Sequence, residues 1–292
     1  GSPGPRFAST LGGEIHAMGM PSHMPSTDVT ASVRYLRPGV ERPVYIASEG
    51  GADAALSIQA EFDDCPVTIH NARNLAPPAT LDREGFALVS HVTDVEDFYS
   101  MDTTHYDSEI RALVMAATGA ESALLFDHTL RSDSANIRGE RTIREPASVI
   151  HNDYSDASAI KRLRDLLPSE QAEAKLKRRF AIVNVWRSIN GPITSSPLAL
   201  CAADSAREED FVASERRARD RIGELELVTH NATHRWYYFH EQQFDEALLI
   251  KTFDSATDGR ARRVAHTAFA DPTTAPGAPP RESIESRLML FF

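Results

Sequence analysis

The chain has 292 residues, of which 41% are apolar and 25% are charged, so its composition is that of an ordinary globular protein. Aspartate and glutamate number 42 against 31 lysines and arginines, and the net charge of −11 argues against a nucleic-acid surface, whose footprint would be basic. No run approaches the ~20 apolar residues of a membrane span, and no signal-peptide pattern is visible. Cys65 and Cys201 stand in no metal-binding or redox spacing, so we expect two buried, inert thiols and a cytoplasmic location.

The amino-acid composition of the chain changes near residue 28. Residues 1–28 are rich in Gly, Pro, Ser and Met without periodicity, and we expect a disordered leader that is partly vector-derived. We expect residues 29–292 to form a single domain. In its first part, alternating apolar and polar residues predict strands at 29–38, 42–48, 65–73, 83–93 and 121–130. Helices are predicted at 94–120 and, with a break at Pro168, at 155–179.

Strand patterns dominate the second half of the chain. They lie at 180–189, 198–205, 224–230, 234–240, 246–255, 261–272 and 283–292. Turn signals such as Asn190-Gly191-Pro192 and Asp258-Gly259 separate them, and they do not alternate with helices. The pattern predicts a mainly β fold with flanking helices, either an antiparallel sandwich or a jelly roll. No Gly-x-Gly-x-x-Gly motif indicates a nucleotide cofactor.

The stretch "SVIHNDYSDASA" at 148–159 carries a candidate metal site. In an extended segment His151 and Asp153 point to the same side, while Asn152 faces away and should be dispensable for metal binding. A histidine from a distant strand would complete a set of two histidines and one carboxylate and leave three positions open on iron or a similar ion. Taken alone, His-x-Asp is a weak signal that also occurs by chance, and an ordinary strand end is the simpler interpretation.

Four later histidines are candidates for the missing ligand. His230, His234 and His240 cluster around the aromatic segment at 236–239, where surface or turn positions are the simpler interpretation. His266 lies on the next-to-last predicted strand, directly before the strand that ends the chain. We therefore expect His266 to close the site.

The last strand offers a partner for a dicarboxylate cosubstrate. Arg281 and Ser283 are two residues apart, so both point into the barrel. A guanidinium can donate two parallel hydrogen bonds to a carboxylate, and the serine hydroxyl can add a third. Arg287 shares this strand face and is a competing candidate.

The ordered segments "FDHTLR", "VIHNDYSDASA", "FAIVNVWRSINGP", "RRVAHTAFADP" and "APPRESIESR" resemble the non-haem iron, 2-oxoglutarate-dependent oxygenases related to the cephalosporin hydroxylase of cephamycin biosynthesis. The resemblance covers roughly residues 30–292 and extends to fungal hydroxylases, desaturases, endoperoxidases and aziridine-forming enzymes. It implies a double-stranded β-helix (a cupin-like jelly roll), Fe(II), O2 and 2-oxoglutarate. By residue, it implies iron ligands His151, Asp153 and His266, a cosubstrate clamp of Arg281 with Ser283, and Arg187 as an additional carboxylate partner.

The same resemblance implies oxidation of an unactivated C–H bond in a small natural product or amino acid, with release of succinate and CO2. Hydroxylation, desaturation and ring closure such as aziridine formation all remain open. Radical halogenases of this broad class leave the carboxylate position vacant for chloride, and because Asp153 is kept here, halogenation is disfavoured.

Residues around the motif are candidates to contact the substrate. Phe126, His128 and Tyr154 lie beside it in the sequence, and Trp186 lies on the strand at 180–189. On that strand Asn184 shares a face with Trp186, so Arg187 takes the other face unless a bulge intervenes. Arg187 is accordingly either a structural charge or a carboxylate contact.

Two other functions fit parts of the pattern. A non-catalytic jelly-roll binding module could keep the triad as a structural metal clip, which protein ligands would close. A metal hydrolase could also use histidine and aspartate ligands, but no separate general base accompanies the triad. The expected partner is a small-molecule substrate, without nucleic acid or membrane, and the oligomeric state is not predicted.

Overall fold

Thr27 and Asp28 are the first residues that the structure describes. The structure, a computed structural model, describes residues 27–292, and the rest of the predicted leader lies outside the described residues. Asp28 Oδ1 accepts a hydrogen bond from the backbone N–H of Asn71 at 2.8 Å, and Thr27 Oγ1 accepts one from the Asn71 side chain. These contacts place both residues in the folded domain, two residues ahead of the boundary expected from composition.

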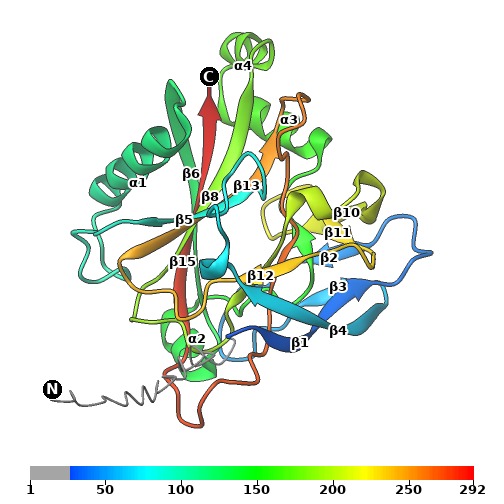
Figure 1. Cartoon of the computed structure of the whole chain (residues 1–292). Helices are drawn as coiled ribbons and strands as arrows, with labels where there is room; N and C mark the ends of the chain where they lie inside the picture. Colours follow the sequence, from blue (N-terminus) through cyan, green and yellow to red (C-terminus); the bar gives the residue numbers. More distant parts are fainter. Residues whose placement is uncertain (1–26) are drawn as a thin grey trace, which may run out of the picture.

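Two curled β-sheets face each other and form the body of the molecule (Figure 1). The larger sheet has the strand order β1 (Val29–Leu36), β4 (Phe62–Asn71), β12 (Trp236–Tyr238), β9 (Leu198–Cys201), β14 (His266–Ala268), β7 (His151–Asn152), β11 (Ile222–Val228), β10 (Phe211–Arg217), β2 (Val44–Ile46) and β3 (Ser57–Gln59). The smaller sheet has the order β5 (Phe86–Ser90), β13 (Glu246–Asp254), β8 (Phe180–Ser188), β15 (Glu282–Phe291) and β6 (Ser122–Ser132). Neighbours are antiparallel except β12 with β4 and β10 with β2. The predicted jelly roll is confirmed.

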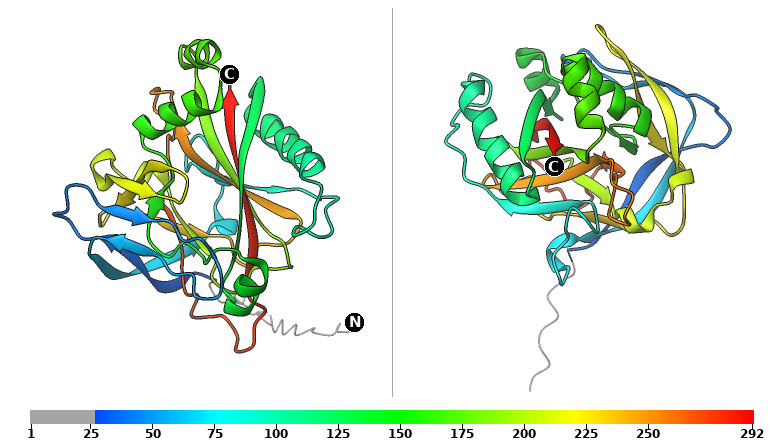
Figure 2. Two further views of the ribbon diagram at one scale, coloured as in Figure 1. Left: turned by 180° about the vertical axis from the view of Figure 1, so that it is seen from behind. Right: turned by 90° about the horizontal axis from the view of Figure 1, so that it is seen from above.

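Helices cover the smaller sheet and one end of the molecule (Figure 2). They are α1 (Thr103–Thr118), α2 (Ala135–Arg141), α3 (Asp156–Leu166) and α4 (Ser169–Leu176), with short 3₁₀ turns at Ala72–Asn74, Ala203–Ser205 and Glu208–Asp210. The Asp102 side chain caps α1, and Gly119 ends it in the left-handed conformation with φ 73°. The helix therefore begins nine residues later than the predicted start at 94.

One stripe of α1 packs on the outer face of the smaller sheet. Tyr106, Ile110 and Val114 are fully buried there against alternate residues of β8 and β15, such as Val185 and Leu288. Their spacing of four residues places them on one side of the helix. Truncating a buried aliphatic side chain such as that of Ile110 to alanine typically costs about 2–5 kcal/mol, so this stripe fixes the helix on the sheet.

Both faces of β8 are buried, but they face different surroundings. Val183 and Val185 point outward to α1, whereas Asn184 and Trp186 point inward between the two sheets. Most of the inner layer is apolar, as Leu200, Ile250 and Val264 illustrate. Polar side chains on the inner faces are therefore exceptions, and they gather around His151.

Several features were not expected from the sequence. Residues 131–146, for which no helix or strand was predicted, contain α2, and the short strand β3 and the strand β10 were not predicted either. Cys201 is buried and Cys65 only partly so, which corrects the expectation of two buried thiols, and neither is in a disulfide. Within residues 27–292, no helix combines the length and apolar character needed to cross a membrane.

Candidate metal centre

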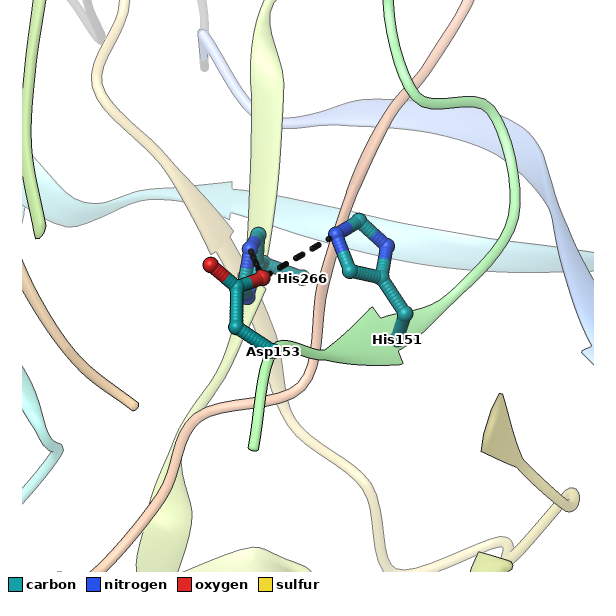
Figure 3. A group of neighbouring side chains, drawn as sticks. All are labelled: His151, Asp153 and His266. Carbon is teal, nitrogen blue, oxygen red and sulfur yellow. Dashed lines mark ion pairs between the residues drawn. The ribbon is translucent and has the colours of Figure 1, made fainter. Parts of the chain in front are cut away.

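The structure brings His151, Asp153 and His266 together (Figure 3). His151 and His266 are direct partners across β7 and β14, and Asp153 follows β7 by one residue. Asp153 Oδ1 lies 3.5 Å from Nε2 of His151 and 3.6 Å from Nε2 of His266. Ligand atoms about 2.0–2.2 Å from one first-row metal ion and at right angles are about 3 Å apart, so the three atoms fit a single ion after small adjustments.

Hydrogen bonds to the backbone fix both imidazoles in the tautomer that a metal requires. Nδ1 of His151 lies 2.8 Å from the carbonyl oxygen of Val149, and Nδ1 of His266 lies 2.8 Å from that of Val264. A carbonyl oxygen only accepts, so each Nδ1 carries the proton and each Nε2 presents its lone pair to the centre. Burial, together with the neighbouring imidazole of His266, lowers the pKa of His151 to about 3, which keeps the ring neutral.

Two side chains of the smaller sheet hold Asp153. Asn184 Nδ2 and Arg287 Nε each donate to Oδ2 of Asp153 at 2.9 Å. Burial opposes ionisation, but the charge of Arg287, supported by the hydrogen bond from Asn184, lowers the pKa of Asp153. The carboxylate is therefore ionised, with Oδ2 held by the sheet and Oδ1 directed at the histidines.

Arg281, directly before β15, and Arg287, within β15, differ in whether a carboxylate neutralises their charge. Besides Asp153, Arg287 contacts the carboxylates of Asp127 and Glu285 at 2.6 and 2.9 Å, so its charge is already neutralised. Arg281 is 2% exposed, and its Nε donates to Ser283 Oγ at 3.1 Å. Arg281 has no ion-pair partner in the part of the chain that the structure describes, and burial lowers its pKa to about 9. An anion is the group that this buried guanidinium lacks.

Asn152 points away from the triad, as the strand geometry predicted, but it is fully buried rather than exposed. Its Nδ2 donates to the carbonyl oxygens of Tyr154 and Thr252 and to the carboxylate of Glu226. The amide ties β7 to neighbouring segments and has a structural role beside the site.

The position of Arg187 removes it from the metal centre. The side chain is fully buried on the outer face of β8, where it donates to the carbonyl oxygens of His91 and Phe244 at 3.1 and 2.7 Å. The register of β8 with β15 is continuous and has no bulge at Ser188, so Arg187 stays on the face opposite Trp186. The expectation of a cosubstrate contact is corrected to a structural charge beneath α1.

Three further candidates for substrate contact lie near the triad in the sequence: Phe126 and His128 on β6, and Tyr154 directly after Asp153. His128 bonds through its two ring nitrogens to Ser286 and to Asp107 of α1, so its imidazole faces the helix rather than the triad. His128 nevertheless lines the cavity beside the triad, so a substrate contact by His128 stays a prediction. Phe126 and Tyr154 line the cavity beside the triad, with ring centroids 6.5 Å apart. The register shift after Arg287 leaves Phe126 as an extra residue in β6, and this bulge turns it inward.

Trp186 supports the cosubstrate candidate instead of lining the cavity. It is 2% exposed and packs among apolar side chains of the inner layer, and Cζ of Arg281 lies 4.9 Å from its ring centroid. An indole face favours a cation at this distance, so Trp186 holds the guanidinium of Arg281 in place. Its predicted role as a substrate contact is corrected accordingly.

A cavity of about 770 Å³ opens onto His151 and Asp153. Segments from both sheets, the start of α1 and α3 form its walls. Its volume is that of a typical small-molecule site, and one wall is the metal candidate. Of the other histidines, His234 is buried elsewhere, against Asp210 and Tyr35.

Several residues of the site were not among the predicted ones. Glu285 joins Asn184 to Arg287, and Arg131 faces Ser283 across β6 and β15. Tyr45, Arg144 and Arg216 also line the cavity, Tyr45 from a predicted strand and the two arginines from segments without a predicted element. The only sequence signal was the arginine-rich composition around Arg144, which does not distinguish a cavity wall from a solvated loop.

A jelly roll with two buried histidines and one carboxylate facing an open cavity is the arrangement of non-haem iron oxygenases. Comparisons with known proteins agree. A family model described as "Oxidoreductase/YMDC permease-like domain" matches residues 33–291. The hydroxylase/desaturase CTB9 of Cercospora beticola is 33% identical over 258 residues, covering 80% of this chain and 79% of the relative. The Fe(II)/2-oxoglutarate-dependent dioxygenase nvfI of Aspergillus novofumigatus is 30% identical and covers 80% and 86%.

A solved structure of the iron and α-ketoglutarate-dependent endoperoxidase NvfI superimposes with a TM-score of 0.79 at 26% identity, over 90% of this chain and 98% of that one. The chain belongs to the family of Fe(II)/2-oxoglutarate-dependent dioxygenases. It is an oxidoreductase whose cofactors are Fe(II), 2-oxoglutarate and O2, and the alternative of a non-catalytic binding module is disfavoured.

Proposed function

We propose that the enzyme oxidises an unactivated C–H bond of a small natural product or amino acid, with His151, Asp153 and His266 as its iron ligands. The observation that carries this proposal is the convergence of two Nε2 lone pairs and one carboxylate oxygen at the wall of a cavity. Three protein ligands leave half of an octahedral shell open for cosubstrate and oxygen.

When bound, the iron supplies the oxidising chemistry, and 2-oxoglutarate is converted to succinate and CO2. The protein's own part is to fix the ligands and orient the cosubstrate. Arg287 and Asn184 hold the second oxygen of Asp153, so that only Oδ1 is offered to the metal. Such contacts to a ligand commonly change metal affinity by about 10–100-fold.

Arg281 and Ser283 bind the distal carboxylate of 2-oxoglutarate in this proposal. The guanidinium of Arg281 lacks a carboxylate partner in residues 27–292, whereas Arg287 has three. A buried cation without an anion is costly, and a carboxylate that arrives with the cosubstrate relieves that cost. Trp186 and Ser283 hold the guanidinium in position before the cosubstrate binds.

A coupled succinate assay tests the function, with amino acids, β-lactams and terpenoid scaffolds as candidate substrates and mass spectrometry of the products. We expect iron- and 2-oxoglutarate-dependent succinate formation that one substrate class stimulates, with a product that has gained one oxygen atom or lost two hydrogen atoms. Succinate formation that persists at full rate in His151→Ala would contradict the ligand assignment. We include a cytoplasmic location and a single catalytic domain in the proposal.

A further inference from the structure

The cavity beside the triad is basic although the chain is acidic. Eight lysines and arginines and six aspartates and glutamates line it, whereas the whole chain has 31 and 42. Asp127 and Asp153 are already paired with Arg287.

Arg144 and Arg216 form the centre of this basic wall. Both are half-buried, and neither has an ion-pair or side-chain hydrogen-bond partner among residues 27–292. Burial lowers the pKa of each, and neighbouring arginines lower it further: Arg131 acts on Arg144, and Arg287 acts on both. The carboxylate of Asp127 acts on Arg144 in the opposite direction, but Arg287 already engages that carboxylate at 2.6 Å. Guanidiniums held close together without an anion repel one another, and such an arrangement persists where a ligand supplies the missing charge.

Tyr45 adds a neutral donor at the same place. It is the direct partner of Arg216 in the pairing of β2 with β10, and its side chain is 7% exposed. Burial raises the pKa of the Tyr45 phenol, while the charges of Arg131 and Arg216 act in the opposite direction. The phenol is thus protonated and lies within electrostatic reach of the guanidiniums.

We propose that Arg144, Arg216 and Tyr45 bind an anionic oxygen group of the primary substrate, a carboxylate or a phosphate, in the cavity that leads to the triad. Guanidiniums recognise these groups through parallel charge-assisted hydrogen bonds, and a phenol adds a third donor. The inference rests on the proposed function and names its substrate class. The anion would anchor one end of the molecule and leave the rest to extend toward His151 and Asp153.

In this proposal the carboxylate of 2-oxoglutarate and the anionic group of the substrate bind to different arginines. Arg281 and Ser283 lie in the buried layer next to Trp186, whereas Arg144 and Arg216 line the open cavity. Arg131 lies between them, because it faces Ser283 across the sheet and its charge also acts on Arg144. For this reason Arg131 is left out of the test.

Binding to the full-length protein loaded with Mn(II) and saturating 2-oxoglutarate tests the inference, since manganese keeps the cosubstrate from being consumed. The titrants are 3-phenylpropanoate, phenyl phosphate and the neutral 3-phenylpropanamide, at constant ionic strength. Binding of Mn(II) and of 2-oxoglutarate is measured first, in the same cell. If the proposed function is wrong, this first binding step fails; if only the anion site is wrong, the first step succeeds and the later titration with the anions fails.

We expect at least one of the two anions, and not the amide, to bind saturably. Arg144→Gln and Arg216→Gln should each weaken that binding about tenfold or more, with 2-oxoglutarate affinity unchanged. Arg141→Gln is the matched control, because Arg141 lines the same cavity but is exposed and stacks on Tyr99. Binding of neither anion, equal binding of the amide, displacement of 2-oxoglutarate by the anion, or an equal loss in Arg141→Gln would each overturn the proposal.

Discussion

Arg287 and Asp153 form an ion pair across the two sheets, with Nε of Arg287 2.9 Å from Oδ2 of Asp153. The pair occupies one carboxylate oxygen and leaves Oδ1 facing the Nε2 atoms of His151 and His266. A residue of the last strand therefore orients a ligand that lies 134 positions earlier in the chain.

Replacing Arg287 should loosen the metal centre without removing a ligand. In Arg287→Gln the carboxylate of Asp153 loses its charged partner, and we expect Fe(II) or Mn(II) affinity to fall about 10–100-fold. Metal titration by calorimetry measures the effect. Arg164→Gln, which removes an exposed ion pair with Glu173, serves as the control and should leave affinity unchanged. Equal affinities in the parent and Arg287→Gln would show that the pair does not position the ligand.

Arg281 and Arg287 should differ in their effect on the cosubstrate. Arg281→Ala removes the guanidinium that lacks a carboxylate partner, so the apparent 2-oxoglutarate requirement should rise about 10–100-fold. Arg287→Ala should raise it less, because its charge is engaged by Asp127, Asp153 and Glu285. The dependence of succinate formation on 2-oxoglutarate concentration gives both values. The reverse ranking would identify Arg287 as the clamp.

Asn152 should matter for stability and not for metal binding. Its side-chain Nδ2 lies within hydrogen-bond distance of three buried acceptors, so Asn152→Ala leaves acceptors unpaired and should lower the free energy of unfolding by about 1–3 kcal/mol. Because the Asn152 amide points away from the metal ligands, the metal affinity of the folded variant should match that of the parent protein. Urea unfolding and metal titration separate the two effects, and a selective loss of metal affinity would refute the strand geometry.

The free energy of unfolding should depend on pH through a buried charge network outside the metal centre. The Asp254 carboxylate has no exposed surface and contacts Lys251 and Arg179 at 2.9 and 2.7 Å. Burial would raise the pKa of Asp254, but Arg179 and Lys251 lower it below its ordinary 3.8. The stabilisation is therefore complete above pH 3.8 and is lost as pH falls through the lower, folded-state value.

Asp254→Asn should accordingly cost about 3–5 kcal/mol at neutral pH, and the difference from the parent should shrink in acid. Asp258→Asn, which breaks an exposed pair with Arg260, should cost about 0–1 kcal/mol. Urea unfolding measured from pH 7 down to the acid limit of the fold compares the three proteins. A deficit of Asp254→Asn that grows as the pH falls would contradict the assigned direction.

The sequence predicted the triad because its parts obey simple geometry. Two residues two apart on a strand share a side, which places His151 with Asp153, and the strand order brings His266 next to them. The same alternation along β15 placed Arg281, Ser283 and Arg287 on one face.

The faces of β8 could not be assigned in the same way. All nine residues of this strand are buried, so alternation separates Trp186 from Arg187 but does not say which one points inward between the two sheets. The packing of α1 decides it, and this is a tertiary contact. The bulge at Phe126 likewise changes which β6 side chains turn inward.

Arg144 and Arg216 lie on segments for which the sequence pattern predicted no helix or strand. Such residues are typical of solvated loops and edge strands, and only the folded structure gathers them around one cavity. Their lack of anionic partners within the described chain is visible only from coordinates.

An anaerobic titration with Fe(II) and 2-oxoglutarate, followed by visible absorption, tests whether His151, Asp153 and His266 hold the iron to which 2-oxoglutarate binds. We expect a weak charge-transfer band that saturates at one equivalent of iron, and its loss in His151→Ala and in His266→Ala, both with the fold retained. A parent protein that binds iron without the band, or variants that keep the band at full intensity, would contradict this assignment.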